Sequence, residues 1–194
     1  KIKNNEYIRL NLVGIGSSFI ANLIYHIDEG QLFVLKENAN SANDKGLLER
    51  EIKNYSILRH PLVPQFIGIT NDNQLVIEFI NGQTLQQKIT SLTIEDELNI
   101  ILQLMLIIEY IHFNLYIHGD IKPDNILIDN DNNVVLIDFE SMILEKSENE
   151  RTINCSIYSD PKCQTYFGDI YSLGKNIEFI INNKRFFVGL TRCN

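Results

Sequence analysis

Short apolar runs separated by polar turns dominate the first 80 residues of the chain. Two of these runs, Tyr7–Leu12 and Phe19–Tyr25, flank a Gly-Ile-Gly sequence, and this pattern predicts a hairpin with a tight tip. The next run, Leu32–Lys36, alternates like a strand and ends in a lysine. Leu47–Leu58 instead repeats apolar side chains every three or four residues, which predicts a helix.

Helical spacing is the main pattern in the rest of the chain. Leu98–Phe113 is apolar on nearly every face, so we expect a buried central helix, too short and too polar to span a bilayer. Thr93 and the acidic residues after it predict a capped helix start. A last helix, Leu173–Asn182, should have one side in water, and the apolar Phe186–Val188 after it should fold back onto the surface. The residues expected to face water are Lys175, Glu178 and Asn182.

Composition and charge narrow the class of protein. With 194 residues, of which 44% are hydrophobic, the chain can bury a core as one compact domain. The net charge of −8 argues against a nucleic-acid partner, because phosphates bind to basic surfaces. Three cysteines without a CxxC pair favour a reducing compartment, and no signal peptide is visible. We therefore expect a cytoplasmic protein without a membrane partner.

The candidate chemistry is concentrated in one polar loop, Ile117–Leu127. It presents a carboxylate (Asp120), a cation (Lys122) and an amide (Asn125), set two and then three residues apart. An apolar run, an Asn/Asp-rich turn and a second apolar run follow, and they predict a hairpin that ends at a second carboxylate, Asp138. A base, a neighbouring cation and two oxygen donors for a hard metal ion are the groups that phosphoryl transfer requires.

These motifs resemble those of the protein kinase superfamily, in which HxDxKPxN is followed by DFG. Lys36 stands where the family's VAIK strand has its lysine. Glu51 stands ten residues before Pro61, at the distance of the helix glutamate that pairs with that lysine, although Glu49 competes for the role. The run from Gln74 to Gly82 is similar to the last strand and hinge of the small lobe, with Ile77 as gatekeeper.

The resemblance extends from the glycine hairpin to about Gly174 and implies an α+β, bilobal fold. Residues 1–194 would form a single kinase-like domain, with an N-lobe of about residues 1–80 and a C-lobe of about residues 81–194. The N-lobe would be an antiparallel sheet with one main helix, and the C-lobe mostly helical and truncated. The chain would be either a naturally minimal kinase, similar to small bacterial effector kinases, or a fragment. If it is a secreted effector, it would act in the host cytoplasm.

The resemblance also implies a role for each matched residue in an ATP-dependent Ser/Thr protein kinase. Asp120 would orient the acceptor hydroxyl and take its proton, and Lys122 would neutralise the γ-phosphate. Asn125 and Asp138 would hold Mg²⁺, or Mn²⁺ in its place, and Asp169 would brace the catalytic loop. The residues expected to contact the nucleotide or its metal are Gly14, Gly16, Ser17, Ala21, Lys36, Glu51, Glu78, Ile80, Asn125 and Asp138. The partner would be a protein substrate of a monomeric enzyme.

Four departures from the family pattern affect these expectations. Gly119 replaces the arginine that reads a phosphorylated activation loop, so activity should not depend on that phosphorylation. Phe19 replaces the third glycine of the loop, which predicts modest nucleotide affinity, and Glu140 replaces the glycine of DFG. Cys155 replaces a threonine near the catalytic residues.

Two other functions stay open. Small-molecule kinases of the aminoglycoside or choline type also carry HGD, Asn and IDFE, although Lys122 is foreign to them. A pseudokinase that acts as a binding scaffold fits the departures at Phe19, Glu140 and Cys155.

Overall fold

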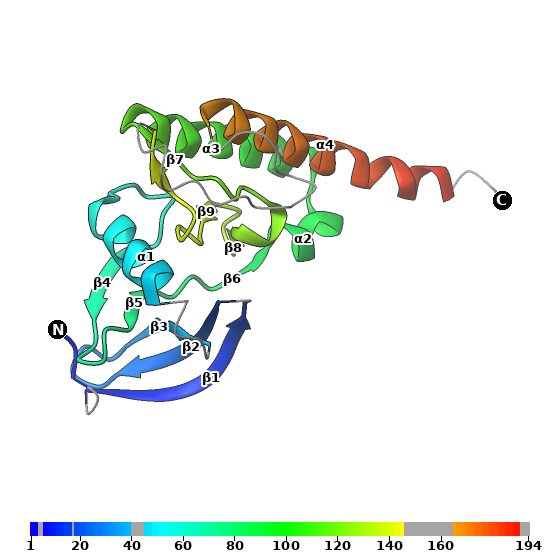
Figure 1. The fold of residues 1–194 in the computed structure, drawn as a ribbon. Helices are drawn as coiled ribbons and strands as arrows, with labels where there is room; N and C mark the ends of the chain where they lie inside the picture. The colour runs from blue at the N-terminus through cyan, green and yellow to red at the C-terminus, as the bar shows by residue number, and fades with distance from the viewer. Residues whose placement is uncertain (4–5, 17, 40–44, 146–164, 191–194) are drawn as a thin grey trace. The chain divides into compact units, whose positions relative to one another are not determined.

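The computed structural model describes residues 1–3, 6–16, 18–39, 45–145 and 165–190, with Lys45 and residues 184–190 described by their backbone alone. The chain divides into two compact units (Figure 1). Unit 1 comprises Lys1–Arg59 and Val63–Ile80, and unit 2 comprises His60–Leu62 and Asn81–Asn194. The predictions for Ser17 and Cys155 concern positions outside the described residues.

Unit 1 is an antiparallel five-stranded sheet with the strand order β1-β2-β3-β5-β4. The strands are β1 (Tyr7–Ile15), β2 (Phe19–His26), β3 (Gln31–Asn38), β4 (Phe66–Ile69) and β5 (Leu75–Glu78). The one helix described in this unit is α1 (Lys45–Ile57). The predicted hairpin, third strand and helix are thereby confirmed, with β1 continuing through Gly14 to Ile15.

One face of the unit 1 sheet carries an apolar core. Ile24, Phe33, Leu35 and Val76 are buried there, and Ile2, Tyr7 and Ile67 pack against them. Because side chains alternate across a strand, Lys36 lies on the opposite face from Leu35 and Glu37. Phe33 and Leu35 are buried in this core, and the residue next to Leu35 must point the other way. Lys36 therefore points away from the core.

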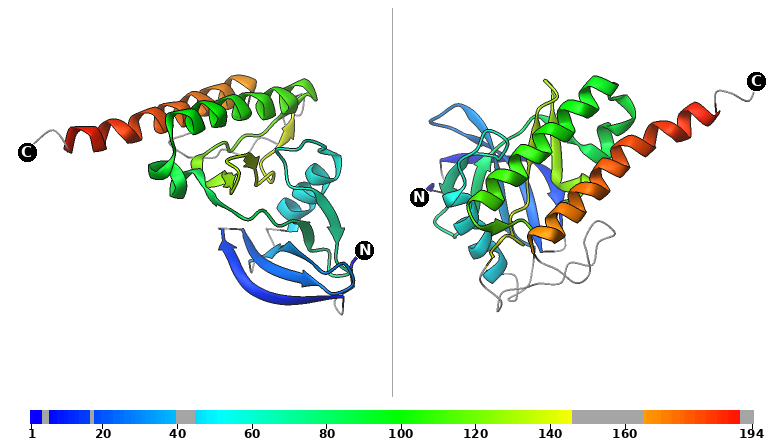
Figure 2. Two further views of the ribbon diagram at one scale, coloured as in Figure 1. Left: turned by 180° about the vertical axis from the view of Figure 1, so that it is seen from behind. Right: turned by 90° about the horizontal axis from the view of Figure 1, so that it is seen from above.

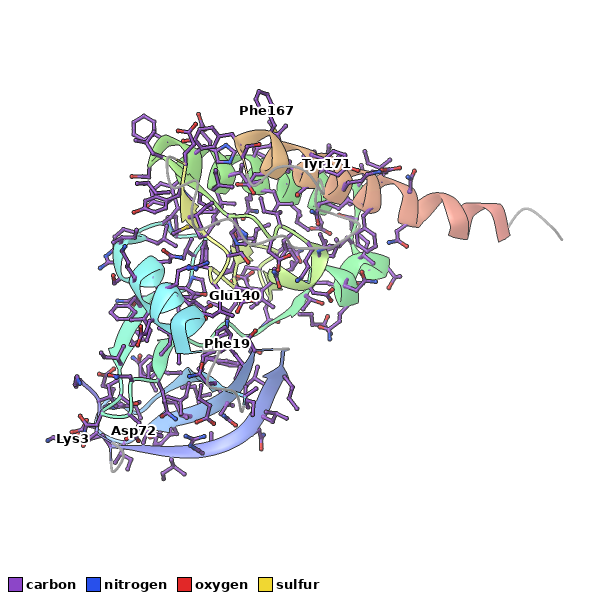
Figure 3. All side chains as sticks on the ribbon, viewed as in Figure 1. Lys3, Phe19, Asp72, Glu140, Phe167 and Tyr171 are labelled. Atoms are coloured by element: carbon purple, nitrogen blue, oxygen red, sulfur yellow. The ribbon has the colours of Figure 1, made fainter. Side chains whose placement is uncertain are left out.

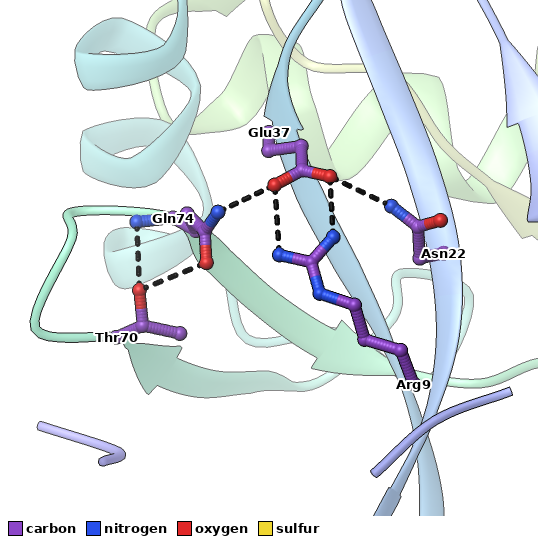
Figure 4. Close-up of polar contacts among 5 residues, drawn as sticks. All are labelled: Arg9, Asn22, Glu37, Thr70 and Gln74. Carbon is purple, nitrogen blue, oxygen red and sulfur yellow. Dashed lines mark hydrogen bonds and ion pairs between the residues drawn. The ribbon is translucent and has the colours of Figure 1, made fainter. Parts of the chain in front are cut away.

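A polar cluster on the core-bearing face joins the strands of unit 1. We call it the Glu37 network, because the Glu37 carboxylate accepts two N–H groups of Arg9, one of Asn22 and one of Gln74 (Figure 4). The Gln74 amide oxygen in turn accepts the Thr70 hydroxyl at 3.3 Å. The pairing of β1 with β2 shifts register directly after Arg9, so the network holds β1 to its neighbours where the ladder is interrupted.

The first two helices of unit 2 are both capped. Thr84 caps α2 (Leu85–Lys88), which continues into a 3₁₀ turn, η1 (Ile89–Ser91). Thr93 caps α3 (Ile94–Phe113), accepting from the Asp96 N–H while Asp96 accepts from the Thr93 N–H. The predicted capped start of this helix is thus confirmed. His60–Leu62 belong to this unit, since the His60 ring lies 4.7 Å from that of Tyr110 and Leu62 accepts from the Leu136 N–H.

The prediction that α3 is buried on nearly every face is wrong for the described structure. Its inner face is buried through residues such as Ile100, Leu104 and Ile111. The opposite face is exposed, and its apolar members are Ile94, Leu98, Leu102, Met105, Leu106 and Phe113, the last being 85% exposed. An apolar pattern predicts burial only where another element covers each face, and the described elements cover one.

Short strands and a long helix complete unit 2. One sheet has the order β6-β8-β9, formed by β6 (Gly82–Thr84), β8 (Ile126–Asp129) and β9 (Val134–Leu136). A separate pair joins β7 (Tyr116–Ile117) to β10 (Ile143–Leu144). A 3₁₀ turn, η2 (Pro123–Asn125), leads into β8. Helix α4 (Tyr166–Leu190) lies beside α3, as both views of Figure 2 show.

Helix α4 departs from the sequence expectation at its C-terminal end. The backbone of Phe186–Val188 continues the helix, so the predicted fold-back of this segment is wrong. The water-facing side is confirmed, because Glu178 and Asn182 are exposed and the Lys175 side chain is 38% exposed. Phe167 and Tyr171 also project from α4 into solvent (Figure 3). None of the described helices is long and apolar enough to cross a membrane.

Candidate active site

The loop between β7 and β8 brings Asp120, Lys122 and Asn125 together in unit 2. Asp120 is buried, and its Oδ2 atom accepts from Lys122 Nζ at 2.6 Å and from Asn125 Nδ2 at 2.9 Å. Asn125 Nδ2 also donates to the Asp120 backbone carbonyl at 2.9 Å. Lys122 is extended, with φ −145° and ψ 161°, as expected for the residue before a proline. The η2 turn that Pro123 starts then returns Asn125 to Asp120.

Asp169 on α4 fixes the same loop from the other side. Its carboxylate accepts the backbone N–H groups of His118 at 2.8 Å and Gly119 at 2.9 Å. It also lies 2.9 Å from His112 Nε2, at the end of α3. Gly119 has φ +79°, a conformation that glycine adopts without steric cost. The expected bracing contact between Asp169 and the loop is therefore present.

Sequence reasoning missed two residues that hold this region. His112 contributes to the Asp169 cluster, as described above. Asn176 is fully buried and donates to the Ile121 carbonyl at 3.1 Å. It stands seven residues after Asp169, two helical turns along the same face of α4. That spacing was the available signal for Asn176.

His118 is a buried imidazole beside the acidic groups. Its Nδ1 atom accepts the Asp120 N–H at 3.2 Å, and its ring packs on Phe139 with centroids 4.9 Å apart. Burial lowers the pKa of His118, and this outweighs the opposing effect of Asp169, Asp120 and Asp138. The imidazole is therefore neutral near pH 7.

Asp138 follows β9 and supplies the second carboxylate. Its φ is +70°. This backbone conformation costs energy for residues other than glycine, and such residues are concentrated at functional sites. The Ile137 N–H donates to the Asn125 carbonyl at 2.9 Å, which joins the end of this strand to the loop that carries Asp120.

The donor set in unit 2 fits a hard cation. The Asn125 amide nitrogen donates to Asp120, which leaves the amide oxygen as the atom for a metal ion. Asp138 would supply a carboxylate oxygen as the second protein ligand. Among the described residues, no three His, Cys, Asp or Glu side chains form a metal-binding group. Two protein ligands suit Mg²⁺, which keeps waters and takes the rest of its shell from phosphates.

In unit 1, the predicted pair of Lys36 and Glu51 is formed. Lys36 Nζ lies 2.7 Å from Glu51 Oε1, with Glu51 fully buried and the Lys36 side chain 14% exposed. Glu49, the competing glutamate, is exposed on α1. Tyr55 and Leu48 are buried like Glu51, so the face of α1 that packs inward also carries the charged partner.

Neither Gly14 nor Gly16 in the glycine hairpin has a positive φ. Gly14 lies opposite Ala21 in the ladder of β1 and β2, and a side chain at Gly14 would meet open space. Gly16 donates its N–H to the Phe19 carbonyl at 2.8 Å. That N–H is therefore engaged within the turn rather than offered to a ligand. Phe19 is buried and its ring lies over Lys36, with Nζ 4.7 Å from the centroid.

The hinge-like segment ends the sheet of unit 1. Ile77 is buried, whereas Ile80 is half-buried. The Glu78 N–H donates to the Gln65 carbonyl at 2.9 Å, and the Glu78 carboxylate accepts the Gln65 N–H at 3.0 Å. An adenine contact at Glu78 would therefore have to come from its carbonyl group.

Comparison with known proteins agrees with this geometry. A model of the protein kinase domain matches residues 7–189. The probable serine/threonine-protein kinase YbdM of Bacillus subtilis is 33% identical over 71% of this chain and 58% of its own length. The probable serine/threonine-protein kinase kinX of Dictyostelium discoideum is 29% identical over 64% of this chain and 12% of its own. Serine/threonine-protein kinase GRIK2 of Arabidopsis thaliana is 26% identical over 87% of this chain and 46% of its own. The chain thus spans less than two thirds of each of these relatives.

Proposed function

This chain belongs to the protein kinase family, and we propose that it transfers the γ-phosphate of ATP to a serine or threonine hydroxyl of a protein substrate. The observation that carries the proposal is the Asp120 carboxylate, held between Lys122 Nζ at 2.6 Å and Asn125 Nδ2 at 2.9 Å. A buried base with an adjacent cation is suited to accept a hydroxyl proton while negative charge develops on the transferring group.

Within this proposal, the residues of unit 2 act on the acceptor and the metal. Asp120 orients the hydroxyl and takes its proton, and Lys122 balances the charge of the γ-phosphate. Asn125 and Asp138 hold Mg²⁺, for which Mn²⁺ could substitute. Bound with the nucleotide, the metal ion would neutralise phosphate charge. Asp169 keeps the loop in place by accepting two of its backbone N–H groups.

The residues of unit 1 act on the nucleotide. Lys36 binds the α- and β-phosphates and is held by Glu51, whose carboxylate keeps the ammonium in one place. Gly14, Gly16 and Ser17 lie over the phosphates, with Gly16 allowing close approach while its N–H stays bonded to the Phe19 carbonyl. Ala21 lies against the adenine base. Backbone groups of Glu78 and Ile80 meet the adenine edge.

Regulation through activation-loop phosphorylation is not expected in this protein. Gly119 occupies the position beside Asp120 and has no side chain to read a phosphate. Its N–H is already bonded to Asp169. The proposed enzyme is therefore active without that modification.

Transfer of radiolabelled γ-phosphate tests the proposed function. The acceptors are a generic basic protein, a panel of aminoglycosides with choline, and no acceptor. The variants are Asp120→Asn and, as a matched control in the same turn, Asp124→Asn, since Asp124 is exposed. We expect labelled serine and threonine in the protein acceptor with the wild type and the control, and none with Asp120→Asn. Labelling of the small molecules alone would replace the proposal with a small-molecule kinase. Nucleotide binding without any transfer would replace it with a pseudokinase.

A further inference from the structure

The ammonium group of Lys36 contacts both a carboxylate and the face of an aromatic ring. Nζ is 2.7 Å from Glu51 Oε1 and 4.7 Å from the centroid of the Phe19 ring. The Phe19 residue is 4% exposed. A cation within about 6 Å of an aromatic centroid is attracted to the ring face, and more strongly where water is excluded.

Strand pairing explains how Phe19 reaches Lys36. Phe19 lies opposite Asn38 in the ladder of β2 and β3, and Lys36 is two residues before Asn38 on the same face. Such diagonal neighbours are within reach of an aromatic and a long side chain. The backbone around Phe19 is also fixed, because its carbonyl accepts from Gly16 and the Ser18 carbonyl accepts from Ala39.

The Phe19 ring limits the directions from which a ligand can approach the Lys36 ammonium. Phe19 covers one side of Nζ and Glu51 takes another, so fewer directions are left for a further ligand. A glycine at this position, as in the loop that the chain otherwise resembles, would leave the first side open to water. The orientation of Lys36 is thus set by this chain's own side chains before any ligand binds.

We propose that Phe19 is a positioning residue for Lys36, which holds the ammonium on Glu51 and prepares it for the phosphates of a nucleoside triphosphate. The part that concerns the nucleotide rests on the proposed function. The contact between ring and ammonium does not.

The contact is tested by nuclear magnetic resonance without nucleotide. Phe19→Leu removes the ring and keeps an apolar side chain, whereas Phe19→Tyr keeps the ring. Phe33→Leu is the matched control, because Phe33 is an equally buried phenylalanine of the same sheet on the face away from Lys36. Lys36→Met assigns the Lys36 signal. We expect the Lys36 Hε protons to be shifted upfield in the wild type, Phe19→Tyr and Phe33→Leu, and not in Phe19→Leu. An unchanged Lys36 signal in Phe19→Leu would overturn the proposal.

The consequence for binding is tested by calorimetry with Mg·ATP and with adenosine, which has no phosphate for Lys36. We expect Phe19→Leu to weaken Mg·ATP binding about three- to tenfold and to leave adenosine binding unchanged. Phe19→Tyr should retain the wild-type affinity for Mg·ATP. Tighter Mg·ATP binding, or parallel changes for both ligands, would refute the role of Phe19 in presenting Lys36. If no variant binds either ligand, the proposed function fails, while the resonance comparison still decides the contact.

Discussion

Replacing Glu37 with glutamine should weaken the sheet of unit 1. The carboxylate accepts four N–H donors, two from Arg9 on β1, one from Asn22 on β2 and one from Gln74 beside β5. Hydrogen bonding to Arg9 lowers the pKa of Glu37, and the same contact raises the pKa of Arg9. Glutamine has one acceptor oxygen and places an N–H₂ group against these donors.

The expected cost follows from the exposure of the groups. The side chains of Arg9 and Glu37 are 44% and 22% exposed, so their ion pair contributes about 0.5–1 kcal/mol. The two amide donors, in a half-buried setting, contribute about 0.5–1 kcal/mol each. Because glutamine keeps part of this bonding, we expect a loss of about 1–2 kcal/mol in the free energy of unfolding.

Urea unfolding followed by circular dichroism measures this loss, and amide hydrogen exchange locates it in the strands. A double-mutant cycle with Arg9→Met should give a coupling of about 0.5–1 kcal/mol that falls in high salt. Glu178→Gln is the control, because the Lys175–Glu178 pair is exposed, and it should cause no measurable change.

The pH dependence gives a second check on the same variant. The pKa of Glu37 is lowered in the folded state, so its contribution is present above the unfolded pKa of about 4.3 and is lost as pH falls through the folded value. The difference between wild type and Glu37→Gln should therefore shrink in acid. A stability unchanged by the substitution at pH 7, with no coupling to Arg9, would refute the reasoning.

Three further predictions concern the catalytic loop and its ligands. Asp120→Asn should abolish phosphotransfer and leave the affinity for Mg·ATP nearly intact in calorimetry. Lys36→Met should instead weaken that affinity, and full activity in both variants would refute the roles proposed for these residues. Burial lowers the pKa of His118, so the unfolded chain takes up the proton first, and stability should fall by up to about 1.4 kcal/mol per pH unit below about pH 6.5. Urea titrations at pH 7, 6 and 5 should show a shallower fall for His118→Phe, and equal slopes would contradict the assignment. Phosphatase-treated protein should keep its transfer rate because Gly119 cannot read a phosphate, and a large loss that rephosphorylation reverses would show that another cation does so.

Local patterns predicted the elements of unit 1 well, because strand alternation and helical spacing are properties of neighbouring residues. The pairing of Lys36 with Glu51 also followed from spacing, once the motifs suggested a kinase-like arrangement. The Glu37 network was not foreseen. It joins side chains from three strands and a turn, and it lies where the pairing of β1 with β2 shifts register. No residue type in the sequence indicates such a shift.

Long-range burial was the main obstacle in unit 2. The sequence of α3 has apolar residues all round, and composition cannot tell which faces another element covers. The role of His112 depends on α3 and α4 lying side by side, and that of Asn176 depends on α4 packing against the loop at Ile121. Both are properties of packing. By contrast, the cluster of Asp120, Lys122 and Asn125 was predictable because a single short loop contains all three.

The contact between Asp169 and the catalytic loop has a consequence for synthesis on the ribosome. The N–H groups of His118 and Gly119 donate to Asp169, which is synthesised 51 and 50 residues after them. The Ile121 carbonyl likewise accepts from Asn176, which is synthesised 55 residues later. Contacts of such sequence separation form slowly, since a long loop must close first. A nascent chain that has emerged only as far as β10 therefore contains Asp120, Lys122 and Asn125 but lacks Asp169, which fixes the backbone of their loop. We expect this loop to become ordered after the start of α4 has emerged and packed against it.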